Sequence, residues 1–289
     1  MVKKKVLCFC ENNGLGERYF IKALKKQESI EVSMFTESKM PIIQNYDYLI
    51  FFECGREKMQ RFFPLLNNIN CKKIFFSQDS HINFDMHCVI INQLKFDAII
   101  TTQKNAVKRF EETGKPVLYC TWAYDPEINK DLKLKRHYDM GIAGTLNPYL
   151  HPMRCNLIGR LSKEFEIFPI AKVDHGEANK VYSSCKIGFN YAIADDVNYR
   201  VFEVISSGAM LITDNKPLDN GLKDLFVPGK EIVVYRHNSF KDLKDKIDYY
   251  LKHPKERQVI IDNATKRIKE YTYDKRAKEI IKFLVKLDE

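Results

Sequence analysis

The chain has 289 residues, of which 45% are hydrophobic and 29% are charged, and its formal net charge is +9. This composition is typical of a globular protein, and the length predicts two domains. No run in the sequence approaches the ~18 apolar residues that a membrane span needs, and no internal repeat is present. These features argue against a membrane-spanning or repetitive chain, and we expect a cytoplasmic protein.

The first ten residues, MVKKKVLCFC, are basic and then apolar. The apolar run is too short for a signal peptide and is cut by Glu11, so we predict a β-strand here. The eight cysteines are scattered among mostly apolar neighbours, and no C-x-x-C pair occurs. This pattern predicts reduced thiols in the core rather than a disulfide framework or a zinc site.

Short apolar runs rich in β-branched and aromatic residues alternate with helical patterns, such as GERYFIKALKK and KNAVKRFEET, over the first 121 residues. Such alternation of unbroken apolar strands with helices is typical of a parallel sheet that is covered on both faces. The predicted strands are VLCFC, EVSMF, YLIFF, KIFFS, DAIIT and VLYCT.

A polar segment, AYDPEINKDLKLKRH, follows and predicts a linker. The alternation then resumes, with helices from about Pro152, near 176–184 and within 198–208, and with helices from about 239 to the end of the chain. The predicted strands of this half are YDMGIAG, FEIFPI, KIGFN, AMLIT and EIVVY. We therefore predict two doubly wound α/β domains, of residues 1–130 and 131–271, with a helical tail.

Ligands bind open parallel sheets at the carboxyl ends of the strands. The loops predicted at those ends are ENNGLGE, SQDSHINF and TWAYDPE in the first domain, and GTLNPYLHP, NYAIADDVNYR and TDNKPLDNGL in the second. Two such domains facing each other would form a cleft.

The stretch NYRVFEVISSGAMLITD, residues 198–214, carries a charge pair in an otherwise apolar segment. Arg200 and Glu203 are three residues apart, so they share one face at the start of a helix, and Asp214 ends the strand that follows. Arginine and helix N–H groups bind phosphate, and a carboxylate accepts hydrogen bonds from ribose hydroxyls. The stretch indicates a nucleotide-diphosphate site or, alternatively, a surface ion pair worth only ~0.2–0.5 kcal/mol.

The apolar residues of this helix predict how it packs in the domain. Val201, Val204 and Ile205 lie on the opposite face and should pack on a sheet in which KIGFN and AMLIT are neighbouring strands. Gly208 should end the helix, because glycine adopts the left-handed conformation that follows many helices.

From residue 198 to about 280, four linked motifs occur in order: R-x-F-E-x-x-x-x-G-x-x-x-x-T-D, L-F-x-P-G-x-E, Y-L-x-H-P-x-E-R and T-Y-x-x-R. This part resembles the C-terminal half of GT-B glycosyltransferases of the group-1 superfamily, and is most similar to the spore-maturation (CgeB-like) type. The first half resembles the family only in layout. The resemblance implies two Rossmann-like domains, with the last helix, about 272–289, packed on the first.

The resemblance also implies an activity. A sugar would pass from a nucleotide-diphosphate-sugar donor, with a UDP-sugar expected, to a hydroxyl acceptor. The acceptor class stays open between a glycan, a protein, a small molecule and a modified nucleic-acid base. No metal or other cofactor is expected, because arginine, lysine and helix dipoles can stabilise a departing diphosphate. DDVN in this sequence is also not a D-x-D metal motif.

In the donor domain, the resemblance assigns the ribose hydroxyls to Glu203 and the donor sugar to Asp195, with Asp196 beside it. Many relatives have a glutamate at the position of Asp195. The glycine-rich loop GIAGTLNP matches the first strand end of the donor domain and contributes Gly144 and Thr145.

The diphosphate is assigned to Arg200 and to Arg154, which is the basic residue nearest the start of the helix after that loop. Arg160 and Lys163, in IGRLSK, are alternatives.

In the first domain, GLGE (14–17) follows the first strand and opens a helix, but Tyr19 stands where a dinucleotide fingerprint has its third glycine. It predicts a tight turn or, by the resemblance, a loop in which Gly14 and Gly16 face the donor phosphates. SQDSH (77–81) ends a strand, and Asp79 or His81 could act as a general base toward the acceptor hydroxyl. Asp79 could instead cap the next segment.

Basic segments such as KDLKDKIDYYLKHPKER predict either solvated helix faces or a site for an anionic partner, nucleic acid included. Two alternatives to a glycosyltransferase therefore stay open. One is a sugar-nucleotide epimerase or hydrolase of the same architecture, and the other is a nucleotide- or nucleic-acid-binding module.

Overall fold

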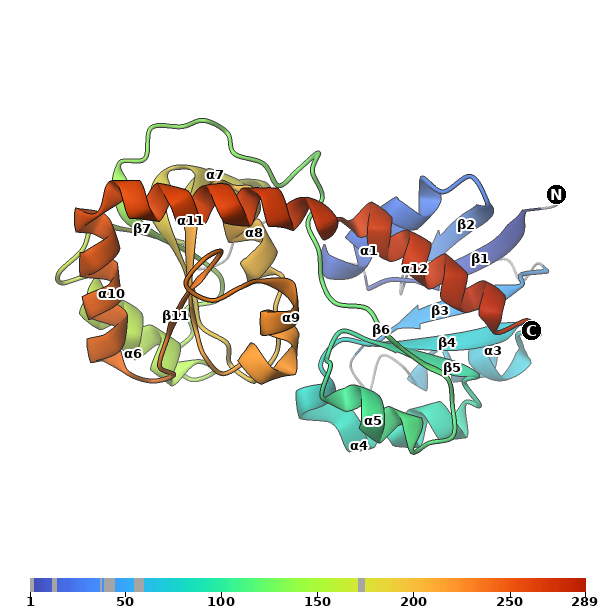
Figure 1. The fold of residues 1–289 in the computed structure, drawn as a ribbon. Helices are drawn as coiled ribbons and strands as arrows, with labels where there is room; N and C mark the ends of the chain where they lie inside the picture. The colour runs from blue at the N-terminus through green and yellow to red at the C-terminus, as the bar shows by residue number, and fades with distance from the viewer. Residues whose placement is uncertain (1–2, 12–14, 37, 39–44, 55–59, 171–174) are drawn as a thin grey trace. The chain divides into compact units, whose positions relative to one another are not determined.

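The computed structural model describes residues 3–11, 15–36, 38, 45–54, 60–170 and 175–289. The chain forms two compact units: unit 1 is Met1–Trp122 together with Tyr273–Glu289, and unit 2 is Ala123–Thr272. The boundary expected from the sequence, between residues 130 and 131, lies further along the chain. Each unit is built on a parallel sheet with flanking helices, so the predicted α/β fold class is confirmed (Figure 1).

Unit 1 has a six-stranded sheet in the order β2-β1-β3-β4-β5-β6. Its strands are β1 (Lys4–Phe9), β2 (Ile30–Phe35), β3 (Tyr48–Phe52), β4 (Lys72–Ser77), β5 (Ala98–Thr101) and β6 (Val117–Tyr119). Its described helices are α1 (Leu15–Lys25), α3 (Phe63–Asn68), α4 (Ser80–Gln93), α5 (Ala106–Glu111) and α12 (Tyr273–Lys286). The core between sheet and helices is rich in aromatic rings, for example Phe9 stacked on Phe51 at 4.4 Å between centroids.

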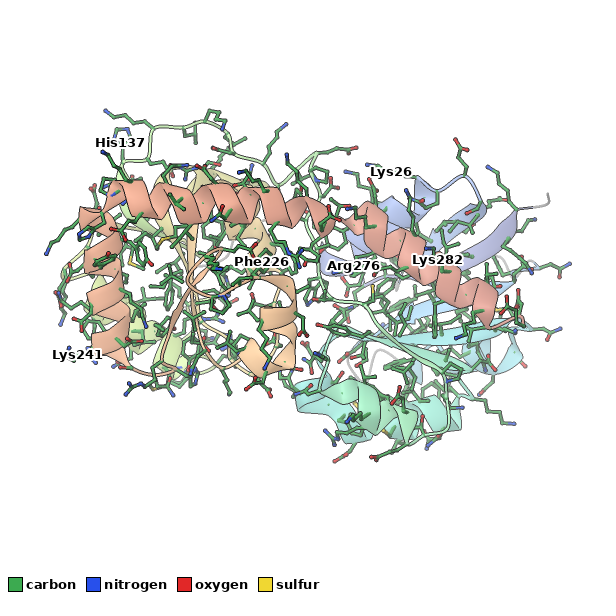
Figure 2. All side chains as sticks on the ribbon, viewed as in Figure 1. Lys26, His137, Phe226, Lys241, Arg276 and Lys282 are labelled. Atoms are coloured by element: carbon green, nitrogen blue, oxygen red, sulfur yellow. The ribbon has the colours of Figure 1, made fainter. Side chains whose placement is uncertain are left out.

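The last helix, α12, packs against α1 within unit 1. The rings of Tyr19 and Tyr273 stack at 5.2 Å between centroids. Figure 2 labels Arg276 and Lys282 on this helix; Arg276 is buried and Lys282 is exposed, as expected of an amphipathic helix that covers a core. Residues at the two ends of the chain therefore complete one folding unit.

Unit 2 has a five-stranded sheet in the order β11-β10-β9-β7-β8. Its strands are β7 (Tyr138–Ala143), β8 (Ile167–Ile170), β9 (Cys185–Asn190), β10 (Met210–Asp214) and β11 (Val233–Tyr235). Its α-helices are α6 (Pro152–Leu161), α7 (His175–Ser183), α8 (Arg200–Ser206), α9 (Lys223–Leu225), α10 (Phe240–Lys252) and α11 (Pro254–Arg267). A π-helix, η1 (Leu218–Leu222), precedes α9, and a 3₁₀ turn, η2 (Ile268–Glu270), follows α11.

Helix α8 is fixed to the sheet as its apolar pattern predicts. Strands β9 and β10 are parallel neighbours, with Met210 opposite Ile187. Val204 packs so closely on β9 that a Cβ on Gly188 would lie 2.4 Å from its Cγ1. Gly208 follows the helix with a φ of +73°, so the prediction that it ends the helix is confirmed.

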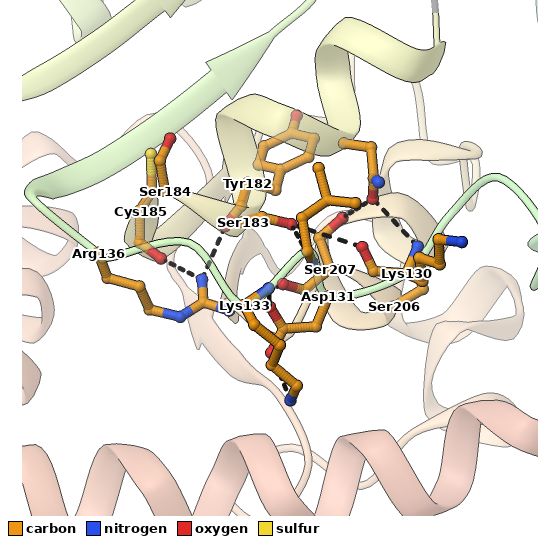
Figure 3. A network of polar contacts seen from close by, with 12 residues as sticks. Lys130, Asp131, Lys133, Arg136, Tyr182, Ser183, Ser184, Cys185, Ser206 and Ser207 are labelled. Atoms are coloured by element: carbon orange, nitrogen blue, oxygen red, sulfur yellow. Dashed lines mark hydrogen bonds and ion pairs between the residues drawn. The ribbon is translucent and has the colours of Figure 1, made fainter.

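The segment predicted as a linker, residues 123–137, runs from the end of unit 1 to the first strand of unit 2 and is hydrogen-bonded to unit 2 (Figure 3). The Arg136 guanidinium donates to the carbonyls of Tyr182, Cys185 and Ser207 at 2.6–2.8 Å. Two of these carbonyls lie at the carboxyl ends of α7 and α8, where helices leave carbonyl groups unpaired and carry partial negative charge. A charged segment that looks like a linker therefore caps two helices.

Three lysines of α10, namely Lys241, Lys244 and Lys246, are paired with aspartates one turn away. Nζ–Oδ distances are 2.6 Å for Lys241–Asp245 and 2.7 Å for Lys246–Asp242. This pairing supports the interpretation of the basic run as a solvated helix face. All eight cysteines are free, which agrees with the prediction of reduced thiols.

Candidate active site

The candidate site lies at the carboxyl edge of the unit 2 sheet, where the loops after β7, β9, β10 and β11 begin. In parallel sheets this edge is where ligands bind. The strands end in polar residues that are completely buried: Asn190, Thr213 and Asp214 are each 0% exposed. Because buried polar groups need partners, these residues and the loops above them form a connected network.

Arg200 lies between the ends of β7 and β9, and its side chain is buried. Its Nε donates to the Ala143 carbonyl at 2.7 Å and its Nη1 to Asn190 Oδ1 at 2.9 Å. A Cβ on Gly144, whose φ is +144°, would lie 2.5 Å from Nη2, so the guanidinium needs a glycine there. Glu203 is also buried. A surface ion pair between Arg200 and Glu203 is therefore the wrong interpretation of this helix.

Arg154, in the first turn of α6, is the second buried cation of the site and is 6% exposed. Its Nη1 donates to the Thr145 carbonyl at 3.1 Å, and its buried Nε has no hydrogen-bond partner within the described part of the chain. Burial and the nearby charge of Arg200 lower the pKa of Arg154 to about 10. Among the residues that the structure describes, neither arginine forms an ion pair with a carboxylate. Of the two, Arg154 is the cation whose buried charge is poorly compensated, which is costly until an anion binds.

The structure separates the three basic candidates of this region. Arg160 and Lys163 are exposed, unlike Arg154. The Arg160 guanidinium lies 3.6 Å from the centroid of the Phe240 ring, at the far end of α6. Only Arg154 belongs to the buried network.

Two more buried polar atoms near Arg154 have no partner: His151 Nδ1 and the hydroxyl of Tyr235. Burial raises the pKa of Tyr235, with a further rise from Asp214 and a small decrease from Arg154. Burial also lowers the pKa of His151, as do the charges of Arg154 and Arg200. These unpaired groups, together with the two arginines, indicate a place for a polar, negatively charged ligand.

The acidic candidates of unit 2 lie at the same carboxyl edge of the sheet as the two arginines. Glu203 is 4% exposed and lies one turn along α8 from Arg200. Asp195 and Asp196 are half-buried in the loop between β9 and α8. Asp196 and Glu203 are close enough to Arg200 to favour its charged form. The structure thus brings Gly144, Thr145, Arg154, Asp195, Asp196, Arg200 and Glu203 to one edge of one unit.

Sequence reasoning missed two residues of this network. Asn190 accepts from Arg200 and donates to the Thr213 hydroxyl at 3.0 Å, and the Tyr182 hydroxyl accepts from the Ala143 N–H at 3.1 Å. A signal existed for Asn190, which is a polar residue at the end of the apolar run KIGFN. No comparable signal existed for Tyr182, since it lies inside a helical pattern.

The candidates of unit 1 are more dispersed. Gly16 is in α1, and a Cβ there would lie 2.4 Å from the Trp122 ring, so the residue allows close packing. Gly14 lies outside the described residues. Asp79 is exposed at the N-cap position of α4, although its side chain makes no capping hydrogen bond. His81 is half-buried, and its Nδ1 contacts Gln103 Nε2.

The predicted loop SQDSHINF is mostly helix, because α4 begins at Ser80. Its start is fixed by Glu53, which accepts from the N–H groups of Gln78 and Asp79 at 2.7 and 2.9 Å. Glu53 also pairs with His87 at 2.9 Å, inside the core. This buried anchor holds the strand end where Asp79 and His81 emerge.

Two units, each a parallel sheet with flanking helices, match the GT-B fold of glycosyltransferase structures. The model of the family described as "Glycosyl transferase-like" matches residues 132–282, which is more than half of the chain. The chain therefore belongs to this family and is an enzyme, a glycosyltransferase.

Solved structures with the same fold include sucrose-phosphate synthase from Thermosynechococcus elongatus, with a TM-score of 0.72, 10% identity and 99% of each chain covered. HepE from Anabaena, in complex with UDP and glucose, has a TM-score of 0.70 and 12% identity over 98% of this chain and 100% of its own. An alpha-glucosyltransferase in complex with UDP-glucose and DNA has a TM-score of 0.69 and 11% identity, over 98% and 100%.

The structural similarity to an epimerase is weaker than the similarity to these glycosyltransferases. A UDP-N-acetylglucosamine 2-epimerase matches with a TM-score of 0.56 and 10% identity, over 97% of this chain and 95% of its own. A search of curated proteins by sequence found no match. Within the described ranges, no group of three or more His, Cys, Asp and Glu side chains could hold a metal ion. No helix of that same part is long and apolar enough to cross a membrane.

Proposed function

We propose that this glycosyltransferase uses a UDP-sugar as donor and transfers the sugar to a hydroxyl acceptor without a metal ion. The observation that carries the proposal is the pair of buried arginines, Arg154 and Arg200, which form no ion pair with a carboxylate among the described residues. A diphosphate supplies the missing negative charge. The solved structures of the same fold with UDP or UDP-glucose support this choice of ligand.

The two arginines act on the leaving group. As the bond from the anomeric carbon to the diphosphate breaks, negative charge grows on the diphosphate oxygens. Arg154, with its unpaired Nε, stabilises that charge directly. Arg200 has two nitrogens engaged by Ala143 and Asn190, which leaves Nη2, beside Gly144, for a phosphate. Because both groups are held before the reaction, little reorganisation is needed.

The carboxylates bind the two other parts of the donor, the ribose and the sugar. Glu203 accepts hydrogen bonds from the ribose hydroxyls, and Asp195 or Asp196 from the hydroxyls of the sugar. The acceptor hydroxyl loses its proton as the new bond forms, and Asp79 and His81 are the candidate bases. We further propose membership of the spore-maturation (CgeB-like) type and a cytoplasmic location. A nucleic-acid acceptor stays open, since one protein of this fold was solved with DNA.

The test is UDP affinity, measured by calorimetry for the wild type and two variants of α6. Arg154→Met removes the buried cation and is expected to weaken UDP binding about 10- to 100-fold, the range for a charge-assisted hydrogen bond. Arg160→Met, on the same helix but exposed, is the matched control and should bind within about twofold of the wild type. Equal affinities in all three proteins would contradict the site.

A second measurement separates the reaction classes. The wild type is incubated with UDP-glucose labelled in the sugar, with and without a mixture of hydroxyl acceptors. Transfer gives a labelled glycoside that requires acceptor, hydrolysis gives free labelled glucose, and an epimerase gives a new UDP-sugar without acceptor. We expect the first result, with activity lowered at least tenfold in Glu203→Ala.

A further inference from the structure

Asp214 is a buried carboxylate at the end of β10 that the proposed chemistry does not use. It is 0% exposed. Its Oδ2 accepts from the Ala192 N–H at 2.6 Å, and its Oδ1 accepts from the Lys216 N–H at 3.0 Å and lies 3.2 Å from His237 Nδ1. A buried carboxylate is costly unless it is well hydrogen-bonded, so these contacts stabilise the group where it lies.

The three partners of Asp214 lie on three different loops. Ala192 follows β9, Lys216 follows β10 and His237 follows β11. One side chain therefore ties together three of the loops at the carboxyl edge. Because it is fully buried and both its oxygens are engaged, Asp214 does not touch a substrate.

The segment after β10 holds the loop between β9 and α8 at two further points. Lys216 Nζ donates to the Ile193 carbonyl at 3.3 Å, and Asn220 Nδ2 donates to the Asp195 carbonyl. We call Asp214, Lys216 and Asn220 the clamp segment. Its three contacts with the loop between β9 and α8 all reach the first half of that loop, at residues 192, 193 and 195.

The second half of the same loop is held from elsewhere. Asn198 Nδ2 donates to Asn190 Oδ1 at 3.2 Å, and Asn198 Oδ1 accepts from the Arg200 N–H at 3.1 Å. The arginine that faces the diphosphate is thus anchored through β9 and β7, and the acidic part of the loop is anchored through the clamp segment. The two halves can be disturbed separately.

We propose that Asp214 is a positioning residue for the donor sugar. Through Ala192, it sets where the loop leaves β9, and therefore where the carboxylates of Asp195 and Asp196 are presented. The inference rests on the proposed function, since it takes those two carboxylates to face the sugar. It predicts that the clamp segment controls binding of the sugar and leaves binding of the nucleotide nearly unchanged.

The test compares two ligands that differ only in the sugar. In Asp214→Asn the side chain keeps its shape, but one of its two oxygens becomes an NH2 group that cannot accept a hydrogen bond, so either the Ala192 or the Lys216 N–H loses its partner. We expect affinity for UDP-glucose to fall about tenfold and affinity for UDP to change less than twofold, both by calorimetry. Asn220→Ala removes one contact of the same clamp and should give a smaller shift of the same kind.

Ser207→Ala is the matched control for lost stability. Ser207 is also 0% exposed, and its hydroxyl donates to Asn179 Oδ1 at 2.8 Å, away from the loop. This variant should lower the melting temperature without changing the ratio of the two affinities. If Asp214→Asn lowers both affinities equally, as a general loss of folding would, the positioning role is overturned.

Hydrogen exchange gives a readout that does not depend on the ligand. Amides of residues 191–199 should exchange at least tenfold faster in Asp214→Asn than in the wild type, with exchange in α10 unchanged. Unchanged exchange over 191–199 overturns the inference whatever the ligand. If the wild type binds neither UDP nor UDP-glucose but the exchange result holds, the proposed function fails and the anchoring of the loop stands.

Discussion

At the scale of single residues, the candidate site contains one buried cation, Arg154, whose charge is poorly compensated. Arg154 has an unpaired Nε, and its pKa is lowered to about 10 by burial and by Arg200. Proteins keep such costly groups where a ligand completes them, and active sites are commonly less stable than the scaffold around them. We therefore expect Arg154 to lower the stability of the ligand-free protein and to strengthen binding of an anionic ligand.

Arg154→Met should make the ligand-free protein more stable. Methionine fills a similar volume without a charge to desolvate, so the free energy of unfolding should rise by about 1–2 kcal/mol, although the bond to Thr145 is lost. Urea denaturation of both proteins without nucleotide measures the difference. A clear loss of stability would mean that the cation is already compensated in the free protein.

At the scale of elements, α8 carries Arg200 and Glu203 and depends on close contact with β9. Gly188 makes this contact possible, because a Cβ there would lie 2.4 Å from Val204 Cγ1. Gly188→Ala should push the helix outward and cost about 1–3 kcal/mol of stability, with weaker UDP binding. Thermal unfolding and calorimetry check both effects.

The double variant Gly188→Ala, Val204→Ala is the control. It removes the methyl groups that clash and should recover part of the lost UDP affinity, although the smaller side chain leaves the core less filled. If the double variant binds UDP no better than Gly188→Ala alone, the effect of Gly188 does not act through α8.

The carboxyl end of α12 is held to unit 1 by a titratable contact. Asp288 accepts from the Tyr48 hydroxyl at 2.5 Å and pairs with Lys72 Nζ at 2.9 Å, and these contacts hold the pKa of Asp288 well below its usual range. The stabilising contribution is complete above the ordinary carboxyl pKa of about 4 and is lost as the pH falls below it. Asp288 is partly exposed, so the contribution should be below about 1 kcal/mol.

Asp288→Asn should therefore lower the melting temperature at pH 7, and the difference from the wild type should shrink between about pH 4 and pH 2. Thermal unfolding of the two proteins over this range measures it. A difference that stays constant with pH would show that the carboxylate charge does not hold the helix end.

At the scale of the whole molecule, the net charge of +9 does not by itself indicate a nucleic-acid surface. Lysines of α10 are paired with aspartates of the same helix, and the unpaired cations of the candidate site are buried.

UDP at 100 times its Kd should stabilise the protein by about 2.7 kcal/mol, which raises the melting temperature by several degrees. Short duplex DNA at about 0.15 M salt should give no comparable rise, because salt at this concentration weakens non-specific binding to exposed basic side chains. Thermal shift assays with both ligands test this. A larger, steeply salt-dependent rise with DNA would favour the nucleic-acid-binding alternative.

Much of the fold followed from local patterns. Apolar runs predicted the strands, and KIGFN and AMLIT were correctly placed as neighbours, but the order of the other strands was not predicted. That the segment 123–137 is bonded to unit 2 could not be predicted, because Arg136 finds its partners, the ends of α7 and α8, only in the folded unit. The start of α4 was missed for the same reason, since Glu53 holds it across the sheet.

By itself the sequence determined the elements, the doubly wound class and the edge of the sheet where Arg200, Glu203 and Asp214 gather. The spacing of hydrophobic residues and the polar residues at strand ends are local patterns, so they can be recognised in a single sequence. Only the tertiary structure decided that Arg154 is buried and Arg160 exposed, and that Asp214 ties three loops. Burial and hydrogen bonding join residues far apart in the chain, so these roles exist only once the strands have come together.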